Sequence, residues 1–362
     1  MLKDHKPKKI ALPILLLLLS SAILFACSPD FPETTATQSA ATSPELSADP
    51  SATPKIETQV PTPIIAQRLV VLIAAPGADP ALTEQLSLTL SELAAVAGLY
   101  FELRPSFTLD DSTAEIKLLV ALPPDPGLAA LAQSSPATQF LGITIPGLEP
   151  GTNLNVIHDQ EARPDMVGFL AGYLAAVATP EWRVGVISSS DTSQGVEQRQ
   201  GFINGAVFFC GLCRQTYPPF NTYPMYAEAP AGASPPEWLA LADTLIDSAV
   251  GSAYIAPGIG DESLIEYLTA AGINIISTTT PLPGFEEYWI ASITADFSAA
   301  IRSIWPNLMA DQGDLVLSAP LTITHINPDL FSPGRQRLVE KMLDELSDGV
   351  IDTGVATVPD SQ

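Results

Sequence analysis

Short apolar runs that end at a turn and lead into a helix recur along most of this 362-residue chain. The first run (LVVLIAA, residues 69–75) stops at a Pro-Gly-Ala-Asp turn, and apolar residues then return at helical spacing over residues 82–97. Runs this short and β-branched are typical of parallel strands covered on both faces. The unit repeats at residues 116–122, 140–144, 182–187, 253–255 and 272–276. Repeated strand–turn–helix units predict an α/β fold with right-handed crossovers.

The number of such units exceeds what one small sheet needs, because six or seven candidate strands fall on each side of residue 180. We therefore expect two doubly wound lobes of parallel sheet within residues 68–357, with the boundary near residue 180. We also expect residues of about 320–357 to cross back between the lobes. Their last elements are predicted as a helix over 335–346 and a strand over 350–355.

The N-terminus has the pattern of an export signal. Four lysines precede an uncharged Leu-rich run of 17 residues (10–26) that ends in Leu-Phe-Ala before Cys27. A basic start, an apolar core and a small residue at the cleavage point form a secretory signal. The segment resembles a bacterial lipoprotein signal, which implies removal of residues 1–26 and lipidation (palmitate) of Cys27 on the extracytoplasmic face of the cell membrane. The alternative is a single transmembrane anchor, for which the run is at the short limit.

Residues 27–67 are rich in Thr, Pro, Ser and Ala and have no apolar period. Such a segment buries too little surface to offset its ordering entropy, so we expect a disordered tether between the membrane and the folded domain. Residues 358–362 are expected to be a short tail.

Composition excludes several classes of protein. The chain carries 40 acidic and 16 basic side chains, a formal charge of −24, which would repel nucleic acid. A hydrophobic content of 46% excludes a wholly disordered chain. A polytopic membrane protein needs several long apolar runs, and the sequence has one. The sequence contains no P-loop, Gly-x-Ser-x-Gly or His-Glu-x-x-His motif. We therefore expect a binding protein with no cofactor and no enzymatic activity.

Three motifs in the middle of the chain carry a resemblance to a known family. They are GFLAGYLAAVA (168–178), RVGVI (183–187) and QGFINGA (200–206), in this order and spacing. Together they resemble the basic membrane lipoprotein family, which comprises nucleoside-binding receptors of ABC transporters with the type 1 periplasmic-binding-protein fold. The tail 333–355 is similar to the closing helix and strand of that family. The resemblance covers about residues 68–355.

This resemblance implies two lobes with a small-molecule ligand, such as a nucleoside, in the cleft between them. Ligands of such sheets lie at the carboxyl ends of strands, near helix N-termini and backbone N–H groups. A purine nucleoside needs an aromatic ring to stack on its base and carboxylates for its ribose hydroxyls. The candidate ligand-binding residues are Gly77, Asp79, Gly147, Tyr226, Gly258, Thr294 and Asp296.

Several positions depart from the family pattern. Asp79 matches the acid of the first turn, but the Phe-Asn pair that follows it in the family is missing. Thr294 stands where the family has its ribose-binding Asp, Asp296 matches the second Asp, and the family's Lys falls near Pro306. Tyr226 is the expected aromatic contact, just after a strand. Two hypotheses follow: a solute-binding lipoprotein that feeds an ABC importer through its permease, or a ligand-sensing or pocket-decayed module that signals to a partner.

Cys210 and Cys213 form a CxxC motif. In an exported domain we expect a short disulfide. A redox motif would begin a helix rather than follow one, and a metal site would need more partners than three histidines offer. We therefore expect no metal site.

Three other segments have a structural and a functional interpretation. The polar residues 158–161 precede a predicted helix, which favours a cap over metal or acid–base chemistry. Residues 188–191 are expected to form a turn and a helix cap, and the alternative is a hydroxyl-lined wall of the cleft. Tyr217, Phe220 and Tyr223 lie in a Pro-rich loop that is either covered or available for stacking or for a partner.

Overall fold

The computed structural model describes residues 68–111, 115–159 and 163–356, all within one compact unit, Pro63–Gln362. The expected signal segment 1–26, the lipidation site Cys27, the tether 27–67 and the tail 358–362 lie outside the described residues. Among the described residues, no helix combines the length and the apolar character that crossing a bilayer requires.

The first sheet has six parallel strands in the order β11-β5-β4-β3-β1-β2. Its strands are β1 (Leu69–Ile73), β2 (Tyr100–Arg104), β3 (Ile116–Ala121), β4 (Gln139–Ile143), β5 (Leu154–His158) and β11 (Val316–Ser318). The order reverses between β1 and β3, which makes the sheet doubly wound.

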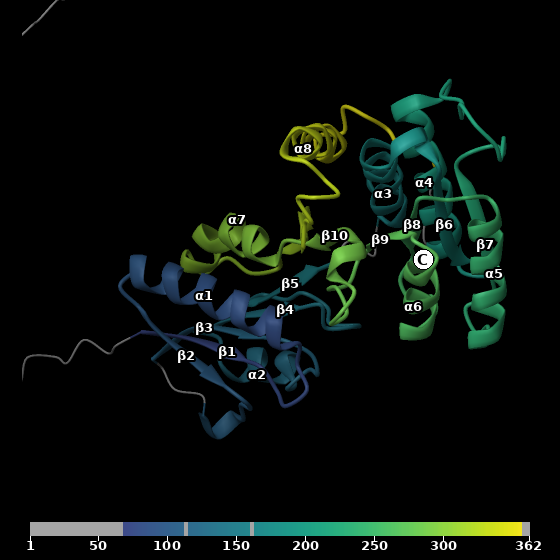
Figure 1. Cartoon of the computed structure of the whole chain (residues 1–362). Helices are drawn as coiled ribbons and strands as arrows, with labels where there is room; N and C mark the ends of the chain where they lie inside the picture. The colour runs from purple at the N-terminus through teal and green to yellow at the C-terminus, as the bar shows by residue number, and fades with distance from the viewer. Residues whose placement is uncertain (1–67, 112–114, 160–162, 357–362) are drawn as a thin grey trace, which may run out of the picture. The chain divides into compact units, whose positions relative to one another are not determined.

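Alternate residues of the first sheet face different helices. Val70 and Leu72 of β1 pack in a core with α1 (Pro80–Val96) and α7 (Phe297–Met309). Val71 and Ile73 pack in a separate core with α2 (Leu128–Ser134). Both faces are therefore buried, as the uninterrupted apolar runs predict. Figure 1 shows α1 and α7 running along the same side of this sheet. We call this sheet and its three helices the first lobe.

The second sheet repeats the arrangement of the first, in the order β12-β10-β9-β8-β6-β7. Its strands are β6 (Val184–Ser189), β7 (Met225–Ala229), β8 (Ser252–Ile255), β9 (Asn274–Ser277), β10 (Trp289–Ala295) and β12 (Leu321–Thr324). All pairs are parallel except β10 with β12. With α3 (Pro164–Ala178), α4 (Ser193–Cys210), α5 (Pro235–Asp247), α6 (Glu262–Ala270) and α8 (Pro333–Ser347), it forms the second lobe. The expected α/β fold with two doubly wound sheets is confirmed.

Helix α3 is buried along its whole length and touches α4 backbone to backbone. A Cβ atom added at Gly168 would lie 2.0 Å from the carbonyl oxygen of Gln198, and one at Gly172 would lie 2.0 Å from that of Phe202. Gly205 of α4 approaches the Phe169 carbonyl equally closely. Glycines four residues apart on each helix therefore permit this contact.

The chain leaves the first lobe earlier than expected from the sequence. Helix α3 packs in the core of the second lobe, so the change of lobe falls between His158 and Pro164 rather than near residue 180. Helix α3 is apolar on all sides because it lies between the second sheet, α4 and α8. It therefore does not cover a face of the first sheet. The boundary near residue 180 is therefore wrong.

The expected last strand over residues 350–355 is absent from the described part of the chain. This segment instead docks against the start of α3. The hydroxyl of Thr353 donates to Asp165 Oδ2 at 2.6 Å, and the Asn204 side chain donates to the Thr353 carbonyl at 2.8 Å. Side-chain hydrogen bonds replace the ladder of a strand, which explains why an apolar pattern alone misled the prediction.

Candidate functional site

The strand order of each sheet reverses once, and ligands of doubly wound sheets bind outside the carboxyl ends of the strands at such points. In the first sheet the reversal lies between β1 and β3, and in the second between β6 and β8. The turns that follow these strands therefore define the candidate site. Each set of turns is described at its own sheet edge.

The turn after β1 holds Gly77 and Asp79. Asp79 is the N-cap of α1, where its Oδ1 accepts hydrogen bonds from the backbone N–H of Ala81 (2.8 Å) and of Leu82 (3.3 Å). The side chain is exposed. The second oxygen, Oδ2, accepts no hydrogen bond from the described residues, so this carboxylate keeps an acceptor for a ligand.

Gly147 follows β4 and Gly258 follows β8, both in the left-handed region, at φ of 70° and 73°. Added Cβ atoms would meet nothing within 4 Å at either position. Glycine is required there by the backbone angle and not by crowding. Both turns are exposed, so a ligand can approach their backbone closely.

Thr294 and Asp296 lie at the end of β10. The Thr294 hydroxyl is 3.3 Å from that of Thr324 on the neighbouring strand β12. Asp296 is the N-cap of α7, and its Oδ1 accepts from the Ala299 N–H at 2.8 Å. Both residues are half-buried. The Thr294 position thus supplies a hydroxyl where the resembled family places a carboxylate.

Asp296 also belongs to the segments that connect the two lobes. The chain crosses between β5 and α3, between β10 and α7, and between β11 and β12. The Asp296 N–H donates to the Pro320 carbonyl at 2.7 Å, and the Ala319 N–H donates to the His158 carbonyl at 2.8 Å. These two bonds tie the third crossing to the second and to the first. The three crossings therefore form one bonded unit.

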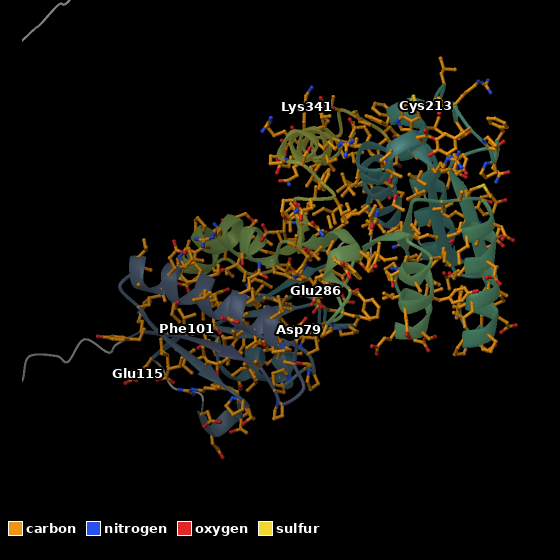
Figure 2. All side chains as sticks on the ribbon, viewed as in Figure 1. Asp79, Phe101, Glu115, Cys213, Glu286 and Lys341 are labelled. Atoms are coloured by element: carbon orange, nitrogen blue, oxygen red, sulfur yellow. A yellow bond between two sulfur atoms is a disulfide. The ribbon has the colours of Figure 1, made fainter. Side chains whose placement is uncertain are left out.

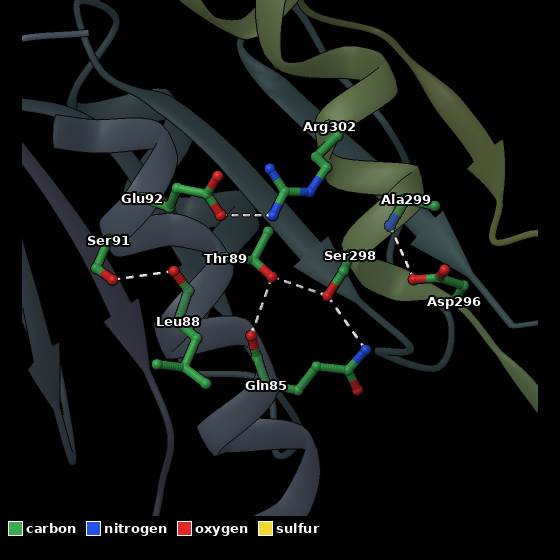
Figure 3. Close-up of polar contacts among 9 residues, drawn as sticks. All are labelled: Gln85, Leu88, Thr89, Ser91, Glu92, Asp296, Ser298, Ala299 and Arg302. Atoms are coloured by element: carbon green, nitrogen blue, oxygen red, sulfur yellow. Dashed lines mark hydrogen bonds and ion pairs between the residues drawn. The ribbon is translucent and has the colours of Figure 1, made fainter. Parts of the chain in front are cut away.

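Helix α7 follows a strand of the second sheet, yet it is fixed to the first lobe. Figure 3 shows its polar contacts with α1: Ser298 Oγ lies 2.8 Å from Thr89 Oγ1 and accepts from Gln85 Nε2 at 3.2 Å. One turn further, Arg302 pairs with Glu92. The hydrogen bond from Arg302 lowers the pKa of the Glu92 carboxyl. The chain therefore changes lobe at Asp296 itself.

Tyr226 lies inside the edge strand β7 and not after its end. Its ring is half exposed and covers the guanidinium of Arg199 on α4, 5.5 Å from the ring centroid. Arg199 also pairs with Glu228, two residues along the same face of β7. The structure thus places Tyr226 apart from the carboxyl-edge turns that hold the other candidates, in a cluster on the face of the sheet. Its role in binding stays a prediction.

The structure adds Asp125 and Thr279 to the carboxyl edges and also places there Asp191, from the predicted turn 188–191. Asp125 follows β3 and accepts from the Gly127 and Leu128 N–H groups, both at 2.9 Å. Asp191 follows β6 and accepts from the Ala231 N–H at 2.8 Å, which joins the turns after β6 and β7. Thr279 follows β9. The signal that could have found them is a Ser, Thr or Asp in the few residues after each apolar run.

The carboxylate of Asp261, at the edge of the second sheet, is held in its ionised form by hydrogen-bond donors. Asp261, the N-cap of α6 in the turn that contains Gly258, accepts from the hydroxyl and the backbone N–H of Ser263. The hydroxyl contact, followed by that of the N–H, lowers the pKa of Asp261 below its usual value. The second edge therefore presents a stable negative charge to a ligand.

The other groups that the sequence singled out are a CxxC motif and two polar segments beside helices. Cys210 and Cys213 are joined by a disulfide at the end of α4. His158 is exposed at the end of β5, and Thr192 is the N-cap of α4 through its bond from the Gly195 N–H. In the described residues, no group of three or more His, Cys, Asp or Glu side chains is arranged to hold a metal ion.

No family model matches the sequence, and no curated protein matches it. Solved structures that are similar in fold include the following two. An ABC transporter solute-binding protein from Conexibacter woesei DSM 14684 is 15% identical, with a TM-score of 0.56, over 79% of this chain and 98% of that chain. A transcriptional activator of the comK gene from Bacillus halodurans is 13% identical, with a TM-score of 0.50, over 81% and 99%.

These likenesses establish the fold as that of the type 1 periplasmic binding proteins, with two parallel-dominated sheets. At such low identity they carry no information on the ligand. The similarity to the basic membrane lipoprotein family, and with it the nucleoside, stays a prediction from the sequence motifs.

Proposed function

We propose that the chain is an extracytoplasmic solute-binding protein, anchored to the cell membrane by lipid on Cys27, that delivers a small molecule to the permease of an ABC importer. The observation that carries this proposal is the crossing unit at His158, Asp296 and Ala319-Pro320, where main-chain hydrogen bonds tie all three connections between the lobes. Connections confined to a few residues support a hinge that closes two lobes on a ligand.

The chemistry of the carboxyl edges supports a ligand rich in hydroxyl or N–H donors. Asp79 and Asp296 each have one carboxylate oxygen in a helix cap and a second that accepts no hydrogen bond from the described residues. Thr294 and Thr279 add hydroxyls that donate and accept. A nucleoside or a sugar carries matching donors. Of these two ligands, a nucleoside or a related molecule is the first candidate, because the sequence motifs resemble those of a nucleoside-binding family.

The alternative is a ligand-sensing or pocket-decayed module on the same fold that signals to a partner. Two observations favour it. Thr294 and Pro306 replace charged residues of the resembled family, and Asp79 and Asp296 are both used as helix caps. In this alternative the lobes are retained while the transport role is absent.

A thermal-shift screen of the full-length chain against nucleosides, nucleobases, sugars and amino acids tests the proposal. A ligand that binds only the folded state raises the unfolding midpoint by mass action. We expect a shift with one class, and nucleosides are the first candidate. A shift with another class keeps the receptor role and removes the nucleoside. No shift in a chain that melts cooperatively contradicts a transport receptor for these classes and favours the alternative.

Two variants test whether the ligand that raises the unfolding midpoint binds at the carboxyl edges. Asp79→Asn and Asp296→Asn keep an oxygen for the helix cap, because Asn caps helices as well as Asp does. They remove only the charge. We expect each to reduce the ligand-induced shift, measured from its own midpoint, while Asp348→Asn at the end of α8 leaves the shift unchanged.

A further inference from the structure

The second lobe contains a pocket of about 280 Å³. It is bordered by the last turn of α3, the single 3-10 turn Pro180–Trp182, the end of α4 and the first turns of α8. These elements lie where β6 begins, at the opposite edge of the sheet from the candidate ligand site. Known small-molecule sites measure about 300 to 1,000 Å³. The pocket lies just below this range, so it suits only a small ligand. In Figure 2, Cys213 and Lys341 mark the end of α4 and α8.

The walls of this pocket are mainly apolar. Val177, Trp182, Phe209 and Leu338 line it from four different elements. Trp182 and Phe209 are half-buried, and Leu338 is 48% exposed. Binding is favourable when a ligand covers apolar surface that otherwise faces water. The pocket therefore favours a ligand with an aromatic or aliphatic body.

The turn that carries Trp182 is strained. Glu181 and Trp182 are consecutive residues in the left-handed region, at φ of 62° and 57°. Residues other than glycine rarely adopt this conformation, and bulky residues least of all. Such backbone strain is concentrated at functional sites. Here it places the indole of Trp182 in the wall of the pocket.

Arg335 supplies the charge of the pocket. Its Nη1 donates to the Ala178 carbonyl at 3.1 Å, and it makes no ion pair with any described residue. A guanidinium has five N–H donors in a planar fork that matches a carboxylate. Arg335 is exposed, so its other donors face water and are accessible to a ligand.

The acidic residue of the pocket, Glu181, forms an ion pair with Arg183. Its Oε1 accepts from Thr216 at 3.0 Å, and its Oε2 lies 3.6 Å from Nε of Arg183. Arg183 is 5% exposed and is held by the Tyr217 carbonyl at 2.6 Å and by the Tyr217 ring. The unbalanced charge that faces the pocket is therefore the positive charge of Arg335.

The apolar wall on α4 is fixed in place before a ligand arrives. Phe209 lies edge-on to Tyr173 at 5.5 Å between ring centroids, and its neighbour Cys210 is held by the disulfide to Cys213. A preorganised wall loses little side-chain entropy on binding.

We propose that this pocket is a second binding site, for a small amphipathic monocarboxylate. Its apolar body lies between Trp182, Phe209 and Leu338, and its carboxylate accepts from the guanidinium of Arg335. The site is independent of the ligand held at the carboxyl edges of the sheets.

Fluorine NMR of the full-length chain with 4-fluorophenylacetate tests this proposal. The matched probe is 4-fluorophenylacetamide, which has the same body but no charge. We expect saturable binding of the acid, displaced by unlabelled phenylacetate, and binding of the amide that is weaker by about two- to fivefold, the range for an ion pair with an exposed side chain. Equal binding of acid and amide, or no saturable binding of either, overturns the proposal.

Variants then locate the site. Arg335→Gln is expected to weaken binding of the acid by about two- to fivefold and to leave binding of the amide unchanged, whereas Arg335→Lys retains part of the preference. Trp182→Ala should weaken both probes. Arg337→Gln on the same helix, which does not line the pocket, and Asp296→Asn are controls that should change neither. If the acid binds with the same affinity to the Arg335→Gln chain, it binds elsewhere and the proposal is wrong. The acid-to-amide ratio of the unaltered chain stands as evidence even if a variant fails to fold.

Discussion

Arg302 Nη2 on α7 lies 2.8 Å from Glu92 Oε2 on α1, although 210 residues separate them in the sequence. The contact joins a helix that follows the second sheet to the first helix of the first lobe (Figure 3). It shows that the lobes exchange an element. Closure about the crossings would therefore move α7 with the first lobe and β10 with the second, with Asp296 between them.

The attachment of α7 predicts where the stability of the first lobe resides. Ile301 is fully buried between α7 and the first sheet, so Ile301→Ala should lower the free energy of unfolding by about 2–5 kcal/mol. Arg302→Ala is the matched control. It removes an exposed ion pair, which contributes little, and should leave the urea midpoint nearly unchanged. Equal losses in the two variants would contradict the assignment of α7 to the core of the first lobe.

The contact between α3 and α4 predicts that Gly172 tolerates no side chain. Its added Cβ would lie 2.0 Å from the Phe202 carbonyl oxygen, a backbone atom that cannot move alone. We expect Gly172→Ala to destabilise the chain by about 1–3 kcal/mol or more, measured by urea unfolding. In Gly334→Ala on α8 the nearest atom to the new Cβ is 3.9 Å away, at the end of the Arg337 side chain. That variant should be neutral, and a loss there as large as at Gly172 would argue against close packing as the cause.

The docking of the C-terminal segment on Asp165 predicts that part of the free energy of unfolding is lost at acid pH. Burial alone raises the pKa of the Asp165 carboxyl, but hydrogen bonds from Arg163 and Thr353 more than offset this and hold it below the ordinary value of 3.8. A lowered folded-state pKa contributes stability above the unfolded pKa, and this contribution is lost as the pH falls through the folded pKa. The free-energy gap between the unaltered chain and Asp165→Asn should therefore shrink as the pH falls from 7 to below about 4.

Urea unfolding at a series of pH values measures this gap. Thr353→Val removes one donor with little change in volume, and it should lower stability at pH 7 in the same direction as Asp165→Asn. A gap that is constant with pH would show that the Asp165 carboxylate does not contribute through its charge.

The proposed anchor predicts a specific dependence on Cys27. Metabolic labelling with palmitate should mark the chain, and Cys27→Ser should abolish both the label and retention with the membrane fraction. Cys213→Ser, which opens the disulfide, is the control and should stay membrane-bound. Membrane retention of the Cys27→Ser chain would favour the uncleaved transmembrane anchor instead.

The strands of the sheet centres were predictable from the sequence, because burial on both faces leaves uninterrupted apolar runs such as residues 69–75. Edge strand β2 was not, since Tyr100, Glu102 and Leu103 are exposed and break the run. Helix α7 contains Pro306 and follows a strand of the other sheet, so neither its presence nor its lobe could be inferred from local pattern. The exchange of α7 is a tertiary feature that no local period encodes.

Part of the candidate site was predictable because turns after apolar runs carry Gly and Asp. Gly77, Asp79, Gly147, Gly258, Thr294 and Asp296 all lie at or just beyond carboxyl ends of strands. Tyr226 does not, because β7 begins at Met225 and the residue falls within the strand. The cap bonds of Asp79 and Asp296, and the bond from Asp296 to Pro320, needed the structure, since each depends on the backbone conformation of the turn.

In the proposed receptor, turns from both sheets hold one ligand. Hydrogen exchange of the full-length chain, with and without the compound that the thermal-shift screen identifies, shows which turns the ligand protects. We expect slower exchange in the turns 74–79 of the first sheet and 257–261 of the second together, with slower exchange at the crossing around Asp296. Protection confined to the turns of one sheet, or found only around Trp182, would contradict it.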